Sequence, residues 1–201
     1  MRFVLAAAAV AATVTAATAL PAGARVAAPG PQCGGTLWKL MTLSDTAKKS
    51  VTWAPTGTTI PDVSKLTAPA KITTARSNSF QKHVWSLTKT VIERYRMASN
   101  GEIVLELFDI PTQTYMNAYL EDSSCLPTGA RGRGQMLTAR SNFLSGCPAP
   151  TNDWQLLGAT ANLSGVGFFN PVKTTMGALK NGAELRPLVS MNITQGCGHF
   201  S

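Results

Sequence analysis

The sequence has few of the residues from which most enzyme active sites are built. Its 201 residues include two histidines and ten acidic residues, and no Gly-x-Ser-x-Gly or His-Glu-x-x-His motif occurs. Hydrolases of the nucleophile-elbow type and helical zinc proteases are therefore not indicated. Composition does not exclude a Ser-His-Asp triad, but His83 starts an expected strand and His199 lies in the C-terminal tail. The sequence favours binding over catalysis.

Closely spaced cysteine pairs are also missing. No Cys-x-x-Cys motif occurs with histidines in ligand register, so a zinc site is not expected. An even number of cysteines in an exported chain instead indicates two disulfides, for which three connectivities exist. A bridge to either of the outermost cysteines would fasten a chain end. The four residues are Cys33, Cys125, Cys147 and Cys197.

Long apolar runs are confined to the N-terminus. Residues 1–20 join one positive residue, Arg2, to an apolar run, and the small-residue stretch "PAGA" follows. This pattern predicts a secretory signal cleaved after Ala24, and hence a secreted protein. A membrane anchor is the alternative, because residues 3–20 are about long enough to span a bilayer, but Ala and Thr dominate the run. The remaining 177 residues fit one domain.

Acidic residues are scarce relative to basic ones. Without the signal, 17 basic residues stand against 10 acidic residues, a formal net charge of +7. Such a surplus favours anionic partners such as nucleic acid, teichoic acid or lipid head groups. A charge excess that only keeps the protein soluble is the alternative. No cofactor or metal is indicated.

The N-terminal part, residues 25–80, predicts little regular structure. Residues 37–43 form a short apolar run, which we interpret as a strand. Residues 54–79 are poor in large apolar side chains and contain Pro55, Pro61 and Pro69. Proline and threonine in this density sustain neither a helix nor a central strand. We therefore expect an irregular arm that wraps around the domain.

Residues 81–201 predict a mainly β domain. Residues 83–97 indicate a long, bent strand with a bulge at Val91 and Ile92. A tight turn at residues 99–101 leads to a second strand, and a third covers residues 114–122. In the second strand, Ile103, Leu105 and Leu107 share one face. These strands form an antiparallel meander.

After residue 122, the spacing of apolar residues changes from that of a strand to that of a helix. Four apolar residues recur at spacings of three, four and four, which is one face of a helix. They are Met136, Ala139, Phe143 and Cys147. A fourth strand follows, with Ala159, Ala161 and Leu163 inward, and residues 183–193 predict a fifth. Pro187 implies an edge, a bulge or a strand end there.

The stretch "SGVGFFNP" raises the question of a phosphate-binding loop. A dinucleotide loop needs three glycines before a helix, whereas Pro171 and a polar loop follow here. Gly165 and Gly167 share strand parity, so we expect both on one face of a coiled strand, where they leave space for a crossing chain. The strand interpretation is favoured.

The order of elements is three strands, one helix and two strands. This order matches an OB-fold, a small five-stranded Greek-key barrel. We therefore expect an OB-fold-like barrel with one helix between its third and fourth strands and an irregular N-terminal arm. Another small β-barrel or a sandwich is the competing interpretation.

Four segments carry a resemblance to a group of uncharacterised exported bacterial proteins. The segments are "LWKLMTLSD", "EIVLELFD", "SGVGFFN" and "NGAELRPL". They resemble the family patterns Trp-x-Val-Lys-Thr-Gly-Thr-Asp, Asp-x-His-Leu-Val-Leu-x-Asp, Thr-Gly-Val-Gly-Phe-Phe-Asp and Asn-Gly-Ile-Glu-Leu-His-Pro-Val. The resemblance spans nearly the whole mature chain and implies no activity. Family members with two cysteines keep counterparts of Cys33 and Cys125, which implies bridges Cys33–Cys125 and Cys147–Cys197.

Three positions depart from the family pattern. An aspartate of the family is Asn170 here, a histidine is Lys173, and a second histidine is Arg186. Any metal binding or proton transfer by those groups in relatives is not expected in this chain. Three acids do match the pattern, and turn stabilisation or strand-end pairing is their expected role: Asp45, Asp109 and Glu184.

The loop "ARGRGQMLTAR" is the best candidate for a contact with an anionic polymer. Its arginines could neutralise phosphates, and Gly132 and Gly134 would let the backbone approach closely. Tyrosines on the strands could stack on bases or sugars, although strand aromatics more often belong to a core. A solvated loop is the alternative for the arginines. The candidate binding residues are Arg131, Arg133, Arg140, Tyr95, Tyr115 and Tyr119.

The leading hypothesis is thus a non-catalytic, exported, disulfide-stabilised binding module for nucleic acid or a cell-envelope polysaccharide. An exported structural or protein-interaction domain is the alternative. A secreted nuclease is less favoured, because it needs a carboxylate cluster beside paired arginines. The only dense acids are Glu106, Asp109, Glu121 and Asp122, and the last two are expected to end the third strand.

Overall fold

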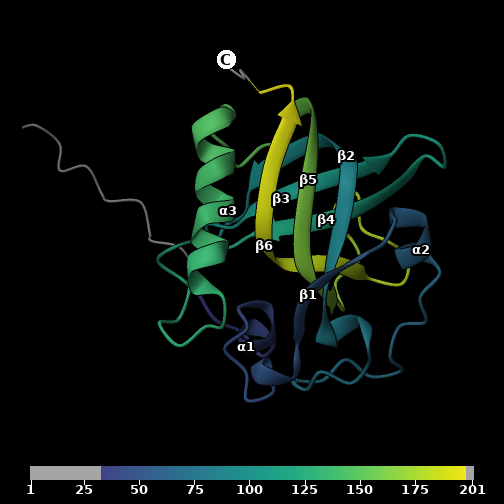
Figure 1. Cartoon of the computed structure of the whole chain (residues 1–201), viewed down its shortest axis with the longest axis vertical. Coiled ribbons are helices and arrows are strands. Elements are labelled where there is room, and N and C mark those ends of the chain that lie inside the picture. Colours follow the sequence, from purple (N-terminus) through teal and green to yellow (C-terminus); the bar gives the residue numbers. More distant parts are fainter. Residues whose placement is uncertain (1–32, 198–201) are drawn as a thin grey trace, which may run out of the picture.

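A computed structural model describes residues 33–197 as a mainly β domain (Figure 1). The expected signal, residues 1–24, and His199 lie outside the described residues. The strands are β1 (Thr52–Gly57), β2 (His83–Met97), β3 (Ile103–Asp109), β4 (Thr114–Leu120), β5 (Gln155–Phe169) and β6 (Ala183–Gln195). The helices are α1 (Trp38–Met41), α2 (Ile60–Ser64) and α3 (Arg133–Gly146), with 3-10 turns η1 (Lys48–Ser50) and η2 (Phe80–Lys82).

All six strands belong to one sheet with the order β1-β2-β3-β4-β6-β5, and β2 also pairs with β5. Each strand from β2 to β6 therefore pairs with two others of this set. These pairings are antiparallel except for β4 with β6, which is parallel. The register of β2 is irregular directly after Ile92, next to the expected bulge. The single long helix, α3, lies between β4 and β5 in the chain, as expected.

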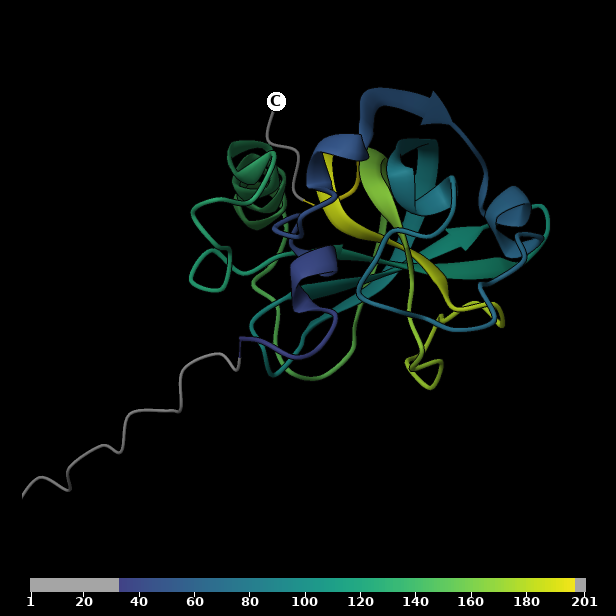
Figure 2. The same cartoon turned by 90° about the horizontal axis from the view of Figure 1, so that it is seen from below.

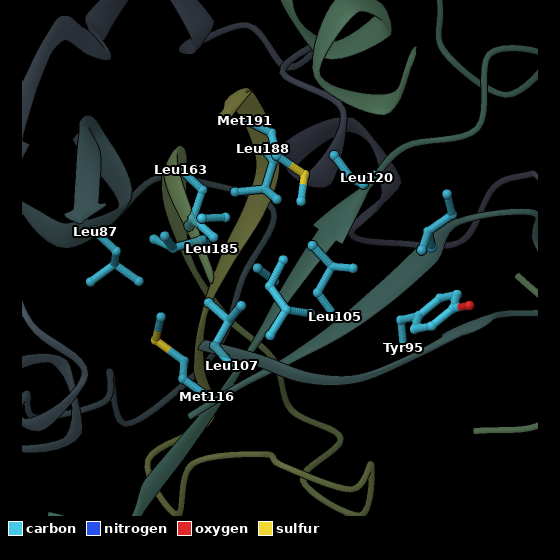
Figure 3. Packing of buried hydrophobic residues seen from close by; sticks show 14 of the residues in the cluster. Leu87, Tyr95, Leu105, Leu107, Met116, Leu120, Leu163, Leu185, Leu188 and Met191 are labelled. Atoms are coloured by element: carbon cyan, nitrogen blue, oxygen red, sulfur yellow. The ribbon is translucent and has the colours of Figure 1, made fainter. Parts of the chain in front are cut away.

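The main core lies between the inward faces of the strands and α3 (Figure 3). Leu105 and Leu107 of β3 point into it together with Leu163 of β5, which confirms the predicted strand faces. On α3, Met136, Ala139 and Phe143 are buried, as the helical spacing predicted. Alternation and helical period thus located the core correctly.

The expected strand at residues 37–43 is wrong, because this run contains the helix α1. The amide of Met41 donates to the carbonyl of Leu37, and the amide and hydroxyl of Thr42 donate to that of Trp38. Trp38 and Leu40 are buried. A short apolar run does not distinguish a buried helical turn from a strand.

The arm is more regular than its proline content suggested. It contains β1, which pairs in parallel with the first half of β2, and the helix α2. Thr59 caps α2 by accepting the amide of Asp62, and Pro61 lies in the first turn, where no amide donor is needed. Pro55 is tolerated because β1 is an edge strand.

A buried arginine fixes the end of this arm. The Arg76 guanidinium donates to Asp45 at 2.8 Å and to the carbonyl oxygens of Leu40 and Gln81. Both charged side chains are almost fully buried. Asp45 also accepts the amide of Ala47, so its role is the turn stabilisation expected for it.

The two glycines of the Gly-Val-Gly stretch lie on β5 and allow close packing. A Cβ at Gly165 would come within 3.0 Å of Leu185, Leu188 and the backbone of Pro187. A Cβ at Gly167 would lie 2.2 Å from the carbonyl oxygen of Phe80. The expected crossing chain is therefore present. The β5–β6 register shifts opposite Pro187, as expected for a bulge.

Two disulfides join Cys33 to Cys125 and Cys147 to Cys197. This is the connectivity implied by the family resemblance. The first links segments 92 residues apart and fastens the start of the described chain to the end of the β4 region.

Within residues 33–197, none of the helices is long and apolar enough to cross a bilayer.

Candidate functional site

The fold separates acidic from basic side chains. Five of the ten acidic residues are buried, whereas only three of the sixteen basic residues between positions 33 and 197 are. The buried acids are Asp45, Glu102, Glu106, Glu121 and Glu184, and the buried basic residues are Arg76, Arg140 and Arg186. The exterior is therefore more strongly basic than the net charge alone indicates.

Four basic residues lie on η1, in the loop before α3 and at the first position of α3, and we call them the basic cluster: Lys48, Lys49, Arg131 and Arg133. Lys48 donates to the carbonyl of Gly129. Arg131 donates to the carbonyl oxygens of Lys48, Lys49 and Val51. These bonds bring segments 80 residues apart together and hold the cluster in place.

Trp53 of β1 lies beside the basic cluster. The Arg131 guanidinium lies 4.7 Å from the centre of the Trp53 ring, a cation–π contact. Gly132, at φ 72°, lies so close to the indole that a Cβ there would be 2.3 Å from its Cη2. The glycine of this loop thus allows a close approach by Trp53, a different partner from the phosphate expected.

A groove of about 610 Å³ opens next to Trp53. Its walls are β1 and α3, and its floor is formed by β5 and β6, beside which α3 lies (Figure 1). The lining contains no charged residue. Its polar side chains are Gln135, Thr138, Asn142, Ser164 and Ser190.

Most of these polar groups are free to bind a ligand. Within the described chain, no hydrogen bond involves the side chains of Gln135, Thr138 or Ser190, while the Asn142 amide donates to the carbonyl of Met191. The groove therefore offers hydroxyl and amide groups beside one aromatic ring. It is bordered by the basic cluster, because Arg133 directly precedes Gly134 of its lining.

The candidate arginines of the sequence are not equivalent in the structure. Arg140 is 8% exposed, donates to the carbonyl oxygens of Leu120 and Glu121, and pairs with Asp122 at 3.2 Å. Burial thus removes Arg140 from any polymer contact. Arg131 is partly exposed but is held by three carbonyl oxygens. Arg133 makes only one long bond, 3.5 Å, to Leu126.

Two of the three candidate tyrosines are interior residues. Tyr95 is 1% exposed, packs edge-on against Phe143 and donates to the carbonyl of Pro148. Tyr119 is also buried. Only Tyr115 is partly accessible, and its ring stacks on Phe108. The two buried tyrosines therefore serve packing, the alternative that the sequence left open, and cannot stack on a ligand.

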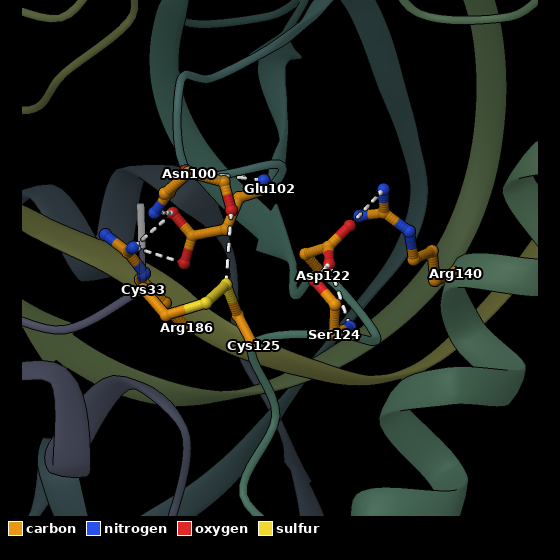
Figure 4. Close-up of a disulfide and its surroundings, with 8 residues drawn as sticks. All are labelled: Cys33, Asn100, Glu102, Asp122, Ser124, Cys125, Arg140 and Arg186. Carbon is orange, nitrogen blue, oxygen red and sulfur yellow. Dashed lines mark hydrogen bonds and ion pairs between the residues drawn. A yellow bond between two sulfur atoms is a disulfide. The ribbon is translucent and has the colours of Figure 1, made fainter. Parts of the chain in front are cut away.

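The buried glutamates form a second feature. Glu106 lies on β3 and Glu184 on β6, while Glu102 directly precedes β3 and Glu121 directly follows β4. We call Glu102, Glu106, Glu121 and Glu184 the carboxylate layer. Arg186 donates to both oxygens of Glu102 (Figure 4). It also lies 3.5 Å from Glu121, 3.7 Å from Glu184 and 4.3 Å from the ring centre of Tyr119. One cation therefore faces three carboxyl groups.

Burial shifts the proton affinities in this layer. Desolvation raises the pKa of Glu184 to about 7, although Arg186 and hydrogen bonds from Asn170 and Tyr119 act against it. Desolvation and the charge of Glu102 raise the pKa of Glu121 well above its usual value. Neither oxygen of Glu121 accepts a hydrogen bond in the described chain. Burial without a hydrogen-bond partner therefore favours the neutral form of Glu121.

The loop between β5 and β6, residues 170–182, covers this layer. Met176 accepts a hydrogen bond from Arg94, and a Cβ at Gly177 would touch Asn117 and Glu106. Asn181 anchors the loop by donating to three carbonyl oxygens at the end of α2. Figure 2 shows this loop and β1 on opposite sides of the molecule. The groove and the carboxylate layer are thus separate.

Two of the three positions that depart from the pattern of the resemblance, Asn170 and Arg186, meet in this layer, whereas Lys173 is exposed in the β5–β6 loop. The Asn170 amide donates to both oxygens of Glu184, and Arg186 lies on the same side of β6. Sequence reasoning identified these positions but missed Glu102 and the burial of the set. Alternation of charged with apolar residues along β3 and β6 was the available signal.

The acids considered for a nuclease do not form one cluster. Glu106 faces Arg94, Asp109 accepts from Thr112, and Asp122 pairs with Arg140. Glu121 and Asp122 directly follow the end of β4, as expected. Among residues 33–197, no group of three or more His, Cys, Asp or Glu side chains is arranged to hold a metal ion.

Comparisons with known proteins give no match: no family model, no curated protein and no solved structure corresponds to this chain.

Proposed function

We propose that this protein is an exported, disulfide-stabilised, non-catalytic domain that binds an anionic polymer at the basic cluster. The separation of charge carries the proposal. Half of the acids are enclosed, so a polymer that approaches the surface meets mainly lysine and arginine. The two disulfides support an oxidising compartment, in agreement with the signal predicted for residues 1–24.

The strand pairing supports an OB-type barrel as the scaffold. Each of the five strands β2 to β6 pairs with two others of this set, in the order β2-β3-β4-β6-β5, and a helix precedes the fourth of them. OB-folds bind oligonucleotides and oligosaccharides, usually on the face of their second and third strands. Here that face, β3 and β4, carries the carboxylate layer beneath the β5–β6 loop. We therefore assign polymer binding to the opposite side, beside Trp53.

The basic cluster has the geometry that charge-based binding needs. Arg131 is fixed by three carbonyl oxygens. Lys49 is exposed, and Arg133 is partly exposed with one long hydrogen bond. Lys49 and Arg133 are thus free to contact phosphate, sulfate or carboxylate groups while Arg131 supplies a preorganised positive field.

Salt-dependent binding to heparin and to DNA tests this proposal. The double variant Lys49→Gln, Arg133→Gln should bind both polymers more weakly. Each lost contact should reduce the slope of log K against log salt by about 0.7–0.9, because one fewer counterion is released. The matched control is Lys173→Gln, Lys180→Gln, which removes the same charge from the β5–β6 loop on the other side.

The outcomes are distinct. A smaller slope for the Lys49, Arg133 variant alone supports the proposal. Equal losses in both double variants would show diffuse attraction without a site, contrary to the proposal. If the wild-type protein binds neither polymer at moderate salt, the proposal fails, and an exported structural or protein-interaction domain replaces it.

A further inference from the structure

We propose that the groove beside Trp53 is a carbohydrate subsite, so that the anionic polymer is a glycan whose sugar rings enter the groove. This inference rests on the proposed function, because the charged groups of the same polymer would contact the basic cluster. It goes further by naming the chemistry of the polymer and a second, uncharged set of contacts.

The lining of the groove matches the hydroxyl groups of a sugar. Hydroxyl and amide side chains both donate and accept hydrogen bonds, as sugar hydroxyls do. Gln135 and Thr138 project from α3, and Ser164 and Ser190 from β5 and β6. Because Gln135, Thr138 and Ser190 have no hydrogen-bond partner within the described chain, a sugar would not have to displace an existing bond.

Size and shape agree with this chemistry. Sites for small organic ligands usually measure about 300–1,000 Å³, and the groove measures about 610 Å³. The groove is partly open to solvent, so a longer chain could continue beyond it. A neutral, open groove suits internal units of a polymer better than a compact charged metabolite.

Trp53 supplies the apolar surface that sugar rings commonly use. Its indole is held by Arg131 and lies against Gly132, so little side-chain entropy is lost on binding. No hydrogen bond within the described chain uses its indole N–H, which is available to a ligand oxygen.

The lining of the groove favours a glycan over a nucleic acid. Single-stranded nucleic acids are typically held by several aromatic rings on which successive bases stack. The described lining of the groove contains one aromatic ring, that of Trp53. Five neutral polar side chains line the same groove. A sulfated, phosphorylated or carboxylated sugar could use them while its anionic group reaches Arg133 beside Gly134.

The test compares three polyanions with matched numbers of charges. They are a sulfated heparin hexasaccharide, an oligothymidylate and inorganic polyphosphate, measured by titration calorimetry against the full mature chain. The variant Thr138→Val, Ser190→Ala removes two hydroxyl groups with little change in volume. The control, Thr36→Val, Thr74→Val, makes similar changes in another polar hollow, beside Lys39 and Asp45.

We expect the groove variant to bind the hexasaccharide about tenfold more weakly, because two hydrogen bonds are lost. Its affinity for polyphosphate and its melting temperature should remain those of the wild type, and the control should match the wild type throughout. Gln135→Leu, a change on the exposed side of α3, provides a second variant if the first fails to fold.

Each alternative result has a separate meaning. If the wild type shows salt-dependent binding but the groove variants bind the hexasaccharide normally, the carbohydrate subsite is wrong and the proposed function survives. Equal losses for all three polyanions, or a loss confined to oligothymidylate, also overturn the subsite. If the wild type binds none of the three, the proposed function itself fails.

Discussion

Charged side chains are arranged differently on the two sides of this domain. On the side of β3, β4 and the β5–β6 loop, four glutamates are enclosed with few compensating cations. On the side of β1 and α3, the basic cluster borders an open, neutral groove. The first side is closed by a loop with dedicated anchors, whereas no described segment of the chain covers the second.

The comparison teaches that the acidic side is built for enclosure. Burying a carboxylate is unfavourable unless it is paired or protonated. Here Arg186 pairs with Glu102, and the raised pKa values of Glu121 and Glu184 favour their protonated forms. The enclosed acids do not contribute to the surface, which leaves the groove side free to attract polyanions. Substitutions on the acidic side should therefore change stability, whereas substitutions on the groove side should change polymer binding.

Removal of the central cation should have the largest effect. Arg186→Met leaves three buried carboxyl groups without their shared partner, and breaking a buried pair typically costs about 3–5 kcal/mol. Denaturant unfolding at pH 7 would measure the loss. Arg133→Met is the matched control on the open side, with an expected change within about 0.5 kcal/mol. Equal losses in the two variants would contradict the distinction between the two sides.

The carboxylate layer should also make stability depend on pH. The folded pKa of Glu184, about 7, lies above its unfolded value of 4.5, so the folded state holds the proton more tightly. The stabilisation of the folded state by this tighter proton binding is complete below about pH 4.5 and is lost as the pH rises to about 7. A shift of this size corresponds to about 3 kcal/mol. Glu121 shifts in the same direction.

Chemical denaturation between pH 4 and 8 would measure this dependence. Glu184→Gln should flatten the curve over this window and stabilise the protein at pH 8, because glutamine can still accept from Asn170 without a charge. Asp62→Asn, which alters an exposed acid on α2, is the control and should leave the slope unchanged. A wild-type stability that rises from pH 5 to pH 7 would contradict the raised pKa of Glu184.

The sequence predicted the parts of the fold that depend on local pattern. Alternation predicted that Leu105 and Leu107 point into the core, and helical spacing predicted the same for Phe143. Because Gly165 and Gly167 are two residues apart on a strand, the sequence also predicted that both lie on one face and allow close packing. These features need only neighbouring residues. The helix α1 was missed because four residues are too few to reveal a period.

The candidate site was harder to predict, since it depends on contacts between distant segments. The carbonyl oxygens that hold Arg131 lie some 80 residues earlier in the chain. Similarly, the burial of Glu184 depends on a loop that Asn181 anchors to α2, more than 110 residues away. Composition identified an arginine-rich loop but could not tell which arginine was already bound within the fold.

The smallest predicted effect separates two arginines of the same helix. Arg140→Gln should destabilise the domain by about 1–2 kcal/mol, because its hydrogen bonds to Leu120 and Glu121 and its pair with Asp122 are buried or nearly so. It should leave the salt slope of polyanion binding unchanged. Arg133→Gln should do the reverse, with a reduced slope and a melting temperature close to that of the wild type. Thermal melts and salt titrations of the two variants would measure both quantities. If Arg140→Gln reduces the slope as Arg133→Gln does, polymer binding is not confined to the exposed residues, and the separation between enclosed and available charge is lost.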